Sequence, residues 1–283
     1  MRIANLDGRL CLVVVDGFID VEKASDGQFD AAPERVYERW PQFRAWADTA
    51  STADPMAMAN VERLGPPSPA PSQIFAIGLN YGAHADESGF AKPASHPPVF
   101  TKYVTSLTGP YGTVRLPPDG HTDWEVELVV VIGRTAFQVG EAEAWDCVAG
   151  LTLGQDISER ILQSAATPPQ FSLGKSYPGF APTGPWLVTA DEFPDPDDIG
   201  LRCTLNGEEM QNGRTSDLIF NVPKLVANLS NVLPLQPGDL LFTGTPAGVG
   251  LGRTPPRFLK PGDELVSTGE NIGELRQRFV AAT

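Results

Sequence analysis

Residues 123–133 read DWEVELVVVIG, and this segment predicts the clearest strand in the chain. Val129 to Ile132 is apolar on both faces of an extended chain, which indicates a strand buried on both sides. Because side chains alternate across a strand, Asp123, Glu125 and Glu127 share one face, with next neighbours about 7 Å apart. Two carboxylates that enter a buried strand must be neutralised or paired. A cation held between Glu125 and Glu127 would do this, whereas an exposed acidic strand face is the plainer alternative.

Short strands and turns surround this segment on both sides. The 28 glycines and 27 prolines are dispersed and form no short repeat, which predicts many turns. Strands without regular intervening helices argue against a dinucleotide-binding sheet or an eight-fold barrel, and favour a β-rich roll or sandwich of the α+β class. Strands are predicted at 74–79, 98–103, 148–155 and 239–243, a hairpin around Asn206-Gly207 at 201–211, and helices at 81–88 and 218–232.

The N-terminal part predicts a small module of its own. Two strands at 10–15 and 17–21 flank a turn at Asp16-Gly17, and 32–50 has near-helical spacing that Pro41 should split. Four prolines in the seven residues from Gly65 make a stiff connection. We therefore expect a small N-terminal α/β domain over 1–64, a Pro-rich linker over 65–73 and a catalytic domain over 74–283.

Composition excludes several classes of protein. The formal charge is −14 and no Lys/Arg cluster occurs, which argues against binding to nucleic acid or to anionic membranes. No apolar run has the length of a membrane span and no secretory signal is apparent, so a cytoplasmic protein is expected. The three cysteines Cys11, Cys147 and Cys203 have no disulfide or zinc spacing and predict buried thiols. Because the protein is negatively charged overall, an anionic substrate would need a local positive charge at its binding site, which a bound divalent cation would supply.

Asp156 offers a third carboxylate for such a cation. It follows the predicted strand 148–155 and precedes Arg160 and Gln163, which are three apart and would project from one helix face. Oxygen ligands favour Mg²⁺ or Mn²⁺, with Ca²⁺ as an alternative, over zinc. The alternative for Asp156 is an ordinary helix N-cap.

Three further positions could carry chemistry. His84 and Glu87 are three apart on the helix predicted at 81–88, so the carboxylate could orient the imidazole as a general base; a surface helix with a chance histidine is the alternative. Lys175 follows a glycine and could pair with an anion, or it is a solvated lysine. Thr245 lies in the Gly-rich loop 244–250, which could cradle a carboxylate or be a plain turn.

Taken in order, these segments resemble the fumarylacetoacetate hydrolase family over about residues 74–279. The stretches that carry the resemblance are GLNYGAHADE at 78–87, DWEVELVVVIG at 123–133, GLTLGQDISERILQ at 150–163, GKSYPGFAPTGPW at 174–186, NGEEMQNGRTSDLIF at 206–220 and PGDLLFTGTPAGVG at 237–250. The chain departs from the family pattern at Ile161 and Pro178, where many relatives carry aspartate.

The resemblance implies a mixed β-sandwich roll with a small N-terminal domain, usually a homodimer, and assigns roles to the residues singled out above. It implies Mg²⁺ or Mn²⁺ bound by Glu125, Glu127 and Asp156. It also implies catalytic roles for His84, Glu87 and Lys175, and substrate contacts from Arg160, Gln163 and Thr245.

We therefore expect a metal-dependent hydrolase that cleaves the C–C bond of a 2,4-dioxo acid similar to an acylpyruvate, through a metal-stabilised pyruvate enolate. Oxaloacetate decarboxylation, or isomerisation or decarboxylation of hydroxyhepta-dienedioates, would use the same site. Two alternatives of other classes stay open: a metal-free glycosidase that uses paired carboxylates, and a non-catalytic binder of small acids.

Overall fold

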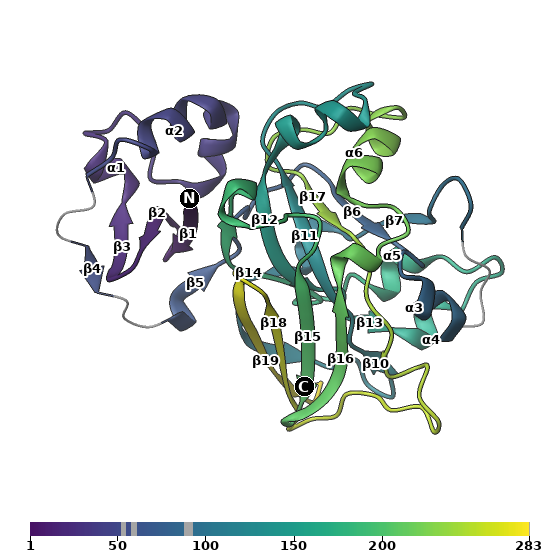
Figure 1. Cartoon of the computed structure of the whole chain (residues 1–283). Helices are drawn as coiled ribbons and strands as arrows, with labels where there is room; N and C mark the ends of the chain where they lie inside the picture. The colour runs from purple at the N-terminus through teal and green to yellow at the C-terminus, as the bar shows by residue number, and fades with distance from the viewer. Residues whose placement is uncertain (52–54, 58–60, 88–92, 283) are drawn as a thin grey trace.

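The computed structural model describes residues 1–51, 55–57, 61–87 and 93–282. One long sheet runs through the molecule (Figure 1), and its 12 strands include two short ones, β5 (Leu64–Gly65) on β1 and β8 (Leu107–Thr108) on β14. The remaining strands follow the spatial order β4 (Met56–Ala57), β3 (Gly17–Asp20), β2 (Arg9–Val14), β1 (Arg2–Leu6), β14 (Ala181–Val188), β12 (Val148–Gln155), β11 (Val126–Ile132), β17 (Leu240–Phe242), β6 (Ile74–Ile77) and β7 (Val99–Thr101).

A second, five-stranded sheet packs against the middle of the long one. Its order is β16 (Glu208–Arg214), β15 (Gly200–Leu205), β18 (Glu264–Gly269), β19 (Gly273–Val280) and β9 (Tyr111–Arg115). A further pair joins β10 (Thr122–Asp123) to β13 (Ser158–Glu159). Two packed sheets with few and short helices confirm the β-rich α+β sandwich that the sequence predicts.

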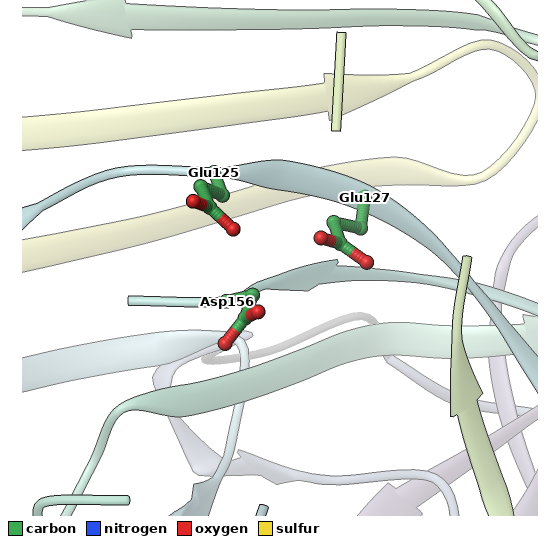
Figure 2. A group of neighbouring side chains, drawn as sticks. All are labelled: Glu125, Glu127 and Asp156. Atoms are coloured by element: carbon green, nitrogen blue, oxygen red, sulfur yellow. The ribbon is translucent and has the colours of Figure 1, made fainter. Parts of the chain in front are cut away.

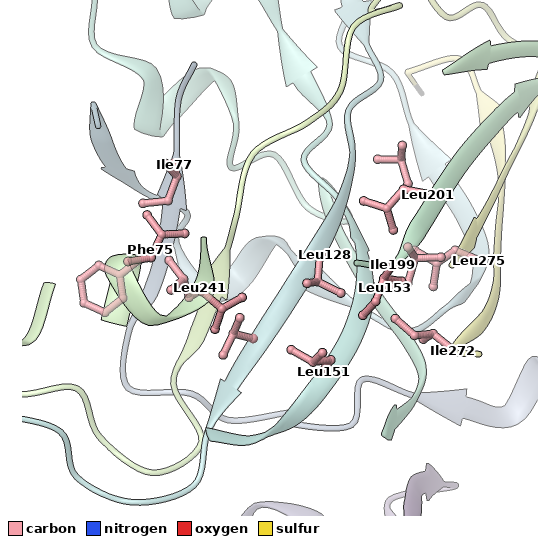
Figure 3. Close-up of a cluster of buried hydrophobic side chains, with 14 of the residues drawn as sticks. Phe75, Ile77, Leu128, Leu151, Leu153, Ile199, Leu201, Leu241, Ile272 and Leu275 are labelled. Atoms are coloured by element: carbon pink, nitrogen blue, oxygen red, sulfur yellow. The ribbon is translucent and has the colours of Figure 1, made fainter. Parts of the chain in front are cut away.

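The core follows from the double-faced strand β11. Leu128 and Val130 pack with Leu153 of β12 and Leu201 of β15 between the two sheets (Figure 3), whereas Val129 and Val131 belong to a second apolar cluster on the opposite face. An apolar run in a strand therefore buries side chains on both faces, as expected of a central strand. The site residues at the start of β11 are held by a strand that is buried along its whole length.

The N-terminal strands continue the long sheet. Strand β1 pairs antiparallel with β14, with Ile3 opposite Leu187. Tyr37, Trp40 and Phe43 come from the neighbouring helices and share an apolar cluster with the second face of β11. The division into domains at residues 65–73 stays a prediction, and this hydrogen-bonded sheet crosses it.

The helices are short. They are α1 (Val21–Ala24), α2 (Trp40–Ala47), α3 (Gly82–Glu87), α4 (Arg160–Gln163), α5 (Phe171–Gly174) and α6 (Val222–Ser230), with 3₁₀ turns η1 (Pro33–Arg39), η2 (Val61–Arg63), η3 (Val104–Ser106), η4 (Glu141–Glu143), η5 (Trp145–Cys147), η6 (Ala190–Glu192) and η7 (Thr215–Asp217). Among the described residues, no helix has the length and apolar character needed to cross a membrane.

One of two helix predictions needs correction. The helix predicted at 218–232 begins only at Val222, because the Asn221 side chain accepts a hydrogen bond from the Lys224 amide and Pro223 occupies the first turn. It ends at Ser230, so Val232 is exposed rather than buried. The segment 32–50 splits before Pro41, as expected, into η1 and α2, and Pro41 sits in the first turn of α2.

Candidate metal centre and active site

Three carboxylates meet where β11 begins and β12 ends (Figure 2). The two strands pair antiparallel with Val126 opposite Gln155, so Asp156 leaves β12 beside the residues that enter β11. The Asp156 amide donates to the Glu125 carbonyl over 2.9 Å. One carboxylate oxygen from each of Glu125, Glu127 and Asp156 lies within 4.8 Å of the other two, and all three residues are buried. The strand register therefore builds an acidic cluster from residues distant in the sequence.

The strand is shorter than the sequence suggested. Strand β11 starts at Val126, and Asp123 belongs to β10. Between them the Glu125 amide donates to the side-chain oxygen of Gln155 at 2.9 Å, so a side chain replaces a strand partner. Asp123 is consequently not part of the carboxylate cluster, and its carboxylate accepts hydrogen bonds from Arg160 and from the amides of Gly250 and Leu251.

Cationic side chains surround the three carboxylates. The Lys175 ammonium donates to Glu125 Oε2 at 2.6 Å and to Asp156 Oδ2 at 2.5 Å. Arg160 Nη2 lies 2.7 Å from Glu125 Oε1. Lys102 Nζ donates to Asp156 Oδ1 at 2.6 Å and also to the Lys175 carbonyl. This set pairs the buried carboxylates of Glu125 and Asp156 with cations.

The two glutamates ionise very differently. Burial opposes the charged form of Glu125, but Lys175 and Arg160 outweigh it and hold the pKa of that carboxyl well below its ordinary value. Burial raises the pKa of Glu127 well above its ordinary value, and the negative charges of Asp156 and Glu125 raise it further. Glu127 also accepts the Gly244 amide at 2.7 Å. The cluster lacks one positive charge beside Glu127, which a divalent cation would supply.

Lys102 is the site residue that sequence reasoning missed. Its ammonium is fully buried, and burial lowers its pKa while Asp156 acts in the opposite direction. It follows β7 as a single lysine with no motif around it, so no local signal distinguishes it from a surface lysine. Only the packing of β7 beside α5 brings it to Asp156.

A pocket of about 500 Å³ opens above the carboxylates. Its polar floor includes Glu125 and Glu127 with His84, Arg160, Gln163, Lys175 and Thr245. The remaining lining residues are Gly78, Ser164, Gly252 and a group that we call the apolar wall: Ile77, Leu79, Pro98, Phe100, Pro169, Phe171, Val249 and Leu251. The Lys175 ammonium lies 4.9 Å from the centre of the Phe100 ring, where wall and floor meet. Ile161 and Pro178, the departures from the family pattern, do not line this pocket.

Helix α3 carries His84 into the polar floor of the pocket. The buried Asn80 anchors the chain just before it, donating to the Phe220 carbonyl at 2.9 Å and to the Thr243 carbonyl at 2.7 Å. His84 is 8% exposed and close enough to Glu125 to favour the ionised carboxylate. Glu87 is the last residue of α3, and its side chain lies outside the described residues, so the predicted His84–Glu87 contact is not placed.

Arg160 and Gln163 project from α4 toward the same pocket, as the three-residue spacing predicts. Arg160 Nη1 donates to Gln163 Oε1 at 3.0 Å. The cap of α4 is Glu159, whose side chain accepts the Ile161 and Leu162 amides, so the N-cap alternative for Asp156 is wrong. The exposed acidic face considered for Glu125 and Glu127 is also wrong, since both are buried.

The Gly-rich loop is tied down from two sides. Thr245 Oγ1 donates to the Val126 carbonyl at 2.8 Å and accepts from Gln211 at 2.7 Å. The buried Asp123 accepts the amides of Gly250 at 2.6 Å and Leu251 at 2.9 Å. The hydroxyl of Thr245 is thus hydrogen-bonded within the protein, and Thr245 also lines the pocket.

The donor set fits a hard divalent cation. Three converging carboxylates without His or Cys ligands match the oxygen coordination of Mg²⁺ or Mn²⁺ rather than zinc. The raised pKa of Glu127 shows that this position favours an added positive charge.

Comparisons with known proteins identify relatives along most of this chain. A 2,4-didehydro-3-deoxy-L-rhamnonate hydrolase of Sphingomonas sp. (strain SKA58) is 45% identical over 264 residues, covering 93% of this chain and 90% of that protein. A fumarylacetoacetate hydrolase from Exiguobacterium antarcticum superimposes with a TM-score of 0.85 at 30% identity, covering all of both chains.

A maleylpyruvate hydrolase from Sphingobium sp. SYK-6, solved with manganese(II) and pyruvate, gives a TM-score of 0.80 at 28% identity over the whole of both chains. Relatives of this chain include hydrolases, isomerases and tautomerases, all of them enzymes. The family model described as fumarylacetoacetate (FAA) hydrolase C-terminal matches residues 73–280. The resemblance drawn from the ordered motifs is therefore confirmed, and the chain belongs to the fumarylacetoacetate hydrolase family.

Proposed function

We propose that this chain is a divalent-metal-dependent hydrolase that cleaves the C3–C4 bond of a 2,4-dioxo acid. The observation that carries the proposal is the convergence of Glu125, Glu127 and Asp156, of which the two glutamates line a pocket that also holds His84. Such a site pairs a place for a cation with a group able to activate water.

Glu125, Glu127 and Asp156 would hold Mg²⁺ or Mn²⁺, with Ca²⁺ as the alternative. A bound ion would supply positive charge beside the carboxylate and keto oxygens of the substrate, where negative charge grows as the bond breaks. Lys175 contributes to the same field, since its ammonium lies between Glu125 and Asp156.

His84 would accept a proton from water while the water oxygen bonds to C4. The C3–C4 bond then breaks and its electron pair moves toward C3 and the keto oxygen, and a proton returned to C3 completes pyruvate. Glu87 would orient the imidazole and raise its basicity. Arg160, Gln163 and Thr245 would contact the substrate from the polar floor.

Two comparisons support this choice over the other activities of the family. One relative is named as a hydrolase of 2,4-didehydro-3-deoxy-L-rhamnonate, and a solved relative with manganese and pyruvate is a maleylpyruvate hydrolase. Pyruvate beside manganese suits the cleavage proposed here.

The test is the Mg²⁺- or Mn²⁺-dependent loss of diketone absorbance with acylpyruvates of several chain lengths. Activity should disappear with EDTA, return with added metal, and be lost in Glu127→Gln and Asp156→Asn. The matched control is Glu38→Gln on the exposed surface, which should keep full activity. Absence of turnover across the panel would count against the proposal.

The second candidate is decarboxylation of oxaloacetate, or isomerisation or decarboxylation of hydroxyhepta-dienedioates, and relatives named as tautomerases and isomerases favour it. These reactions need no attacking water, so His84→Ala would keep decarboxylation and lose hydrolysis. Activity that survives EDTA would favour the glycosidase alternative, and tight binding without turnover would favour a non-catalytic binder of small acids.

We further propose a homodimer in the cytoplasm. Family resemblance supports the dimer, and three buried free thiols suit a reducing compartment. Sedimentation of the intact protein tests the oligomeric state.

A further inference from the structure

A second carboxylate on the substrate would need a cationic partner, and Arg160 is a candidate for it. The guanidinium of Arg160 is already bound by other side chains of the protein. Its Nε and Nη2 donate to Asp123 Oδ2 at 2.9 and 2.6 Å. The same Nη2 lies 2.7 Å from Glu125, and Nη1 donates to Gln163 at 3.0 Å. Every nitrogen of the guanidinium therefore has a partner within the protein.

Lys175 is equally engaged. Its ammonium pairs with Glu125 and Asp156, the residues proposed to hold the cation. Among the described lining residues, Arg160 and Lys175 are the lysine and arginine side chains that reach the pocket. Positive charge is thus concentrated at the floor, where the carboxylate next to the keto group would lie.

Among the described lining residues, those in the outer part of the pocket carry no charge. Leu251, Pro98 and Pro169 of the apolar wall are exposed and form the mouth, whereas Ile77 and Val249 of the same wall are buried, as the floor residues are. Ser164 lines the pocket, is exposed and adds a neutral hydrogen-bonding group. A carboxylate at the far end of a substrate that reaches Ile77 and Val249 would lie against buried hydrocarbon, whereas a methyl or hydroxyl group would be accommodated there.

We propose that the pocket selects 2,4-dioxo acids whose far end is uncharged, and that Asp123 enforces this selection by holding Arg160. The inference rests on the proposed function and narrows its substrate class. Asp123 is a positioning residue, because it acts through Arg160 and through the amides of Gly250 and Leu251 rather than on substrate.

The experiment compares two 2,4-dioxo acids of equal length, one ending in a methyl group and the other in a carboxylate. For the Mn²⁺-loaded enzyme, kcat/KM should favour the methyl compound by roughly 10- to 100-fold, the factor expected for a buried charge left without a partner. Equal rates, or a preference for the carboxylate compound, would overturn the inference.

Two variants locate the cause. Asp123→Asn should release the Arg160 charge and reduce the preference about tenfold or more, mainly through KM for the carboxylate compound. Leu251→Arg adds a cation at the mouth and should do the same without touching Asp123, while the matched Leu251→Gln should leave the preference unchanged. An unchanged preference in both Asp123→Asn and Leu251→Arg, with circular dichroism that shows folded protein, would refute the assignment.

A binding measurement separates this inference from the proposed function. Both compounds are titrated calorimetrically into Mn²⁺-loaded His84→Ala. Tighter binding of the methyl compound supports the inference even if neither compound is cleaved by the native enzyme, and that lack of cleavage contradicts only the proposed hydrolysis. Cleavage of both compounds, with tighter binding of the carboxylate one, refutes the inference and leaves the hydrolysis standing.

Discussion

The ammonium of Lys102 lies 2.6 Å from Oδ1 of Asp156, and both side chains are almost wholly buried. Lys175 takes the other oxygen of the same carboxylate. Asp156 is therefore clamped between two lysines, and Oδ2 is the oxygen on the side of Glu125. The two lysines fix the direction in which this carboxylate faces the rest of the cluster.

Replacing Lys102 by methionine should destabilise the metal-free protein by about 3–5 kcal/mol, because it leaves a buried carboxylate short of one positive charge. Mn²⁺ should then raise the Tm of Lys102→Met more than that of the native protein, since the ion replaces the missing charge. Denaturant unfolding and calorimetric melts with and without Mn²⁺ measure both effects. Lys260→Met on the exposed surface is the control and should change neither; equal Mn²⁺ responses in Lys102→Met and the native protein would contradict the prediction.

Metal binding should weaken as the pH falls. Burial and the neighbouring Asp156 and Glu125 raise the pKa of Glu127 in the metal-free protein, so a proton competes with the metal for this carboxyl at higher pH than at an ordinary glutamate. Binding of Mn²⁺ should release that proton, and the Kd should be larger at about pH 6 than at about pH 8. Calorimetry in buffers of different ionisation enthalpy counts the protons released. Glu127→Gln should bind weakly and lose this release, and a pH-independent Kd in the native protein would speak against it.

The N-terminal module should show a separate dependence on acid. Arg9 donates to Asp20 at 2.7 and 3.1 Å and holds the pKa of that carboxyl below its ordinary value. A lowered folded pKa gives stability that is present above the unfolded pKa of about 3.9 and lost as the pH falls through the folded value.

Asp20→Asn should consequently reduce the free energy of unfolding by about 1–3 kcal/mol at neutral pH and by much less near pH 3. Denaturant unfolding at the two pH values tests this, and Asp16→Asn, on the neighbouring exposed turn, serves as the control. A difference that persists undiminished in acid would show that the ion pair is not its source.

The three cysteines should be inert in the folded protein. All are buried, and burial is the main cause that raises the pKa of Cys11 and of Cys203 to about 12. At about pH 8 a thiol reagent should label the native protein slowly and label three thiols after unfolding. Glu38→Cys adds one exposed thiol as a positive control. Rapid native labelling of any original cysteine would contradict the buried environment.

The acidic cluster could be predicted from the sequence because each part has a local signal. Glu125 and Glu127 precede an apolar run on one strand, and Asp156 directly follows another strand. These groups are distant in the sequence, and the antiparallel pairing of the two strongest predicted strands is enough to bring them together. Turn chemistry at Asn206-Gly207 likewise placed the hairpin of β15 and β16.

The neutralising partners could not be predicted, because they depend on contacts between segments with no shared pattern. Lys102 reaches Asp156 across 54 positions of sequence, and Asp123 reaches Gly250 across 127. Helix α6 begins after its N-cap, Asn221. The apolar spacing that starts at Leu218 predicted an earlier start, because the cap was given no weight. Periodicity thus locates elements, whereas the identity of a buried charge's partner requires the packed structure.

The pairing of β1 with β14 has a consequence for shortened forms of the chain. Strand β14 is hydrogen-bonded to β12, whose end carries Asp156, and β1 covers the other flank of β14. A chain lacking residues 1–64 would expose the unpaired edge of β14, one strand away from Asp156. Exposed strand edges pair with extended segments of other molecules, so we expect such a shortened chain to aggregate through this edge.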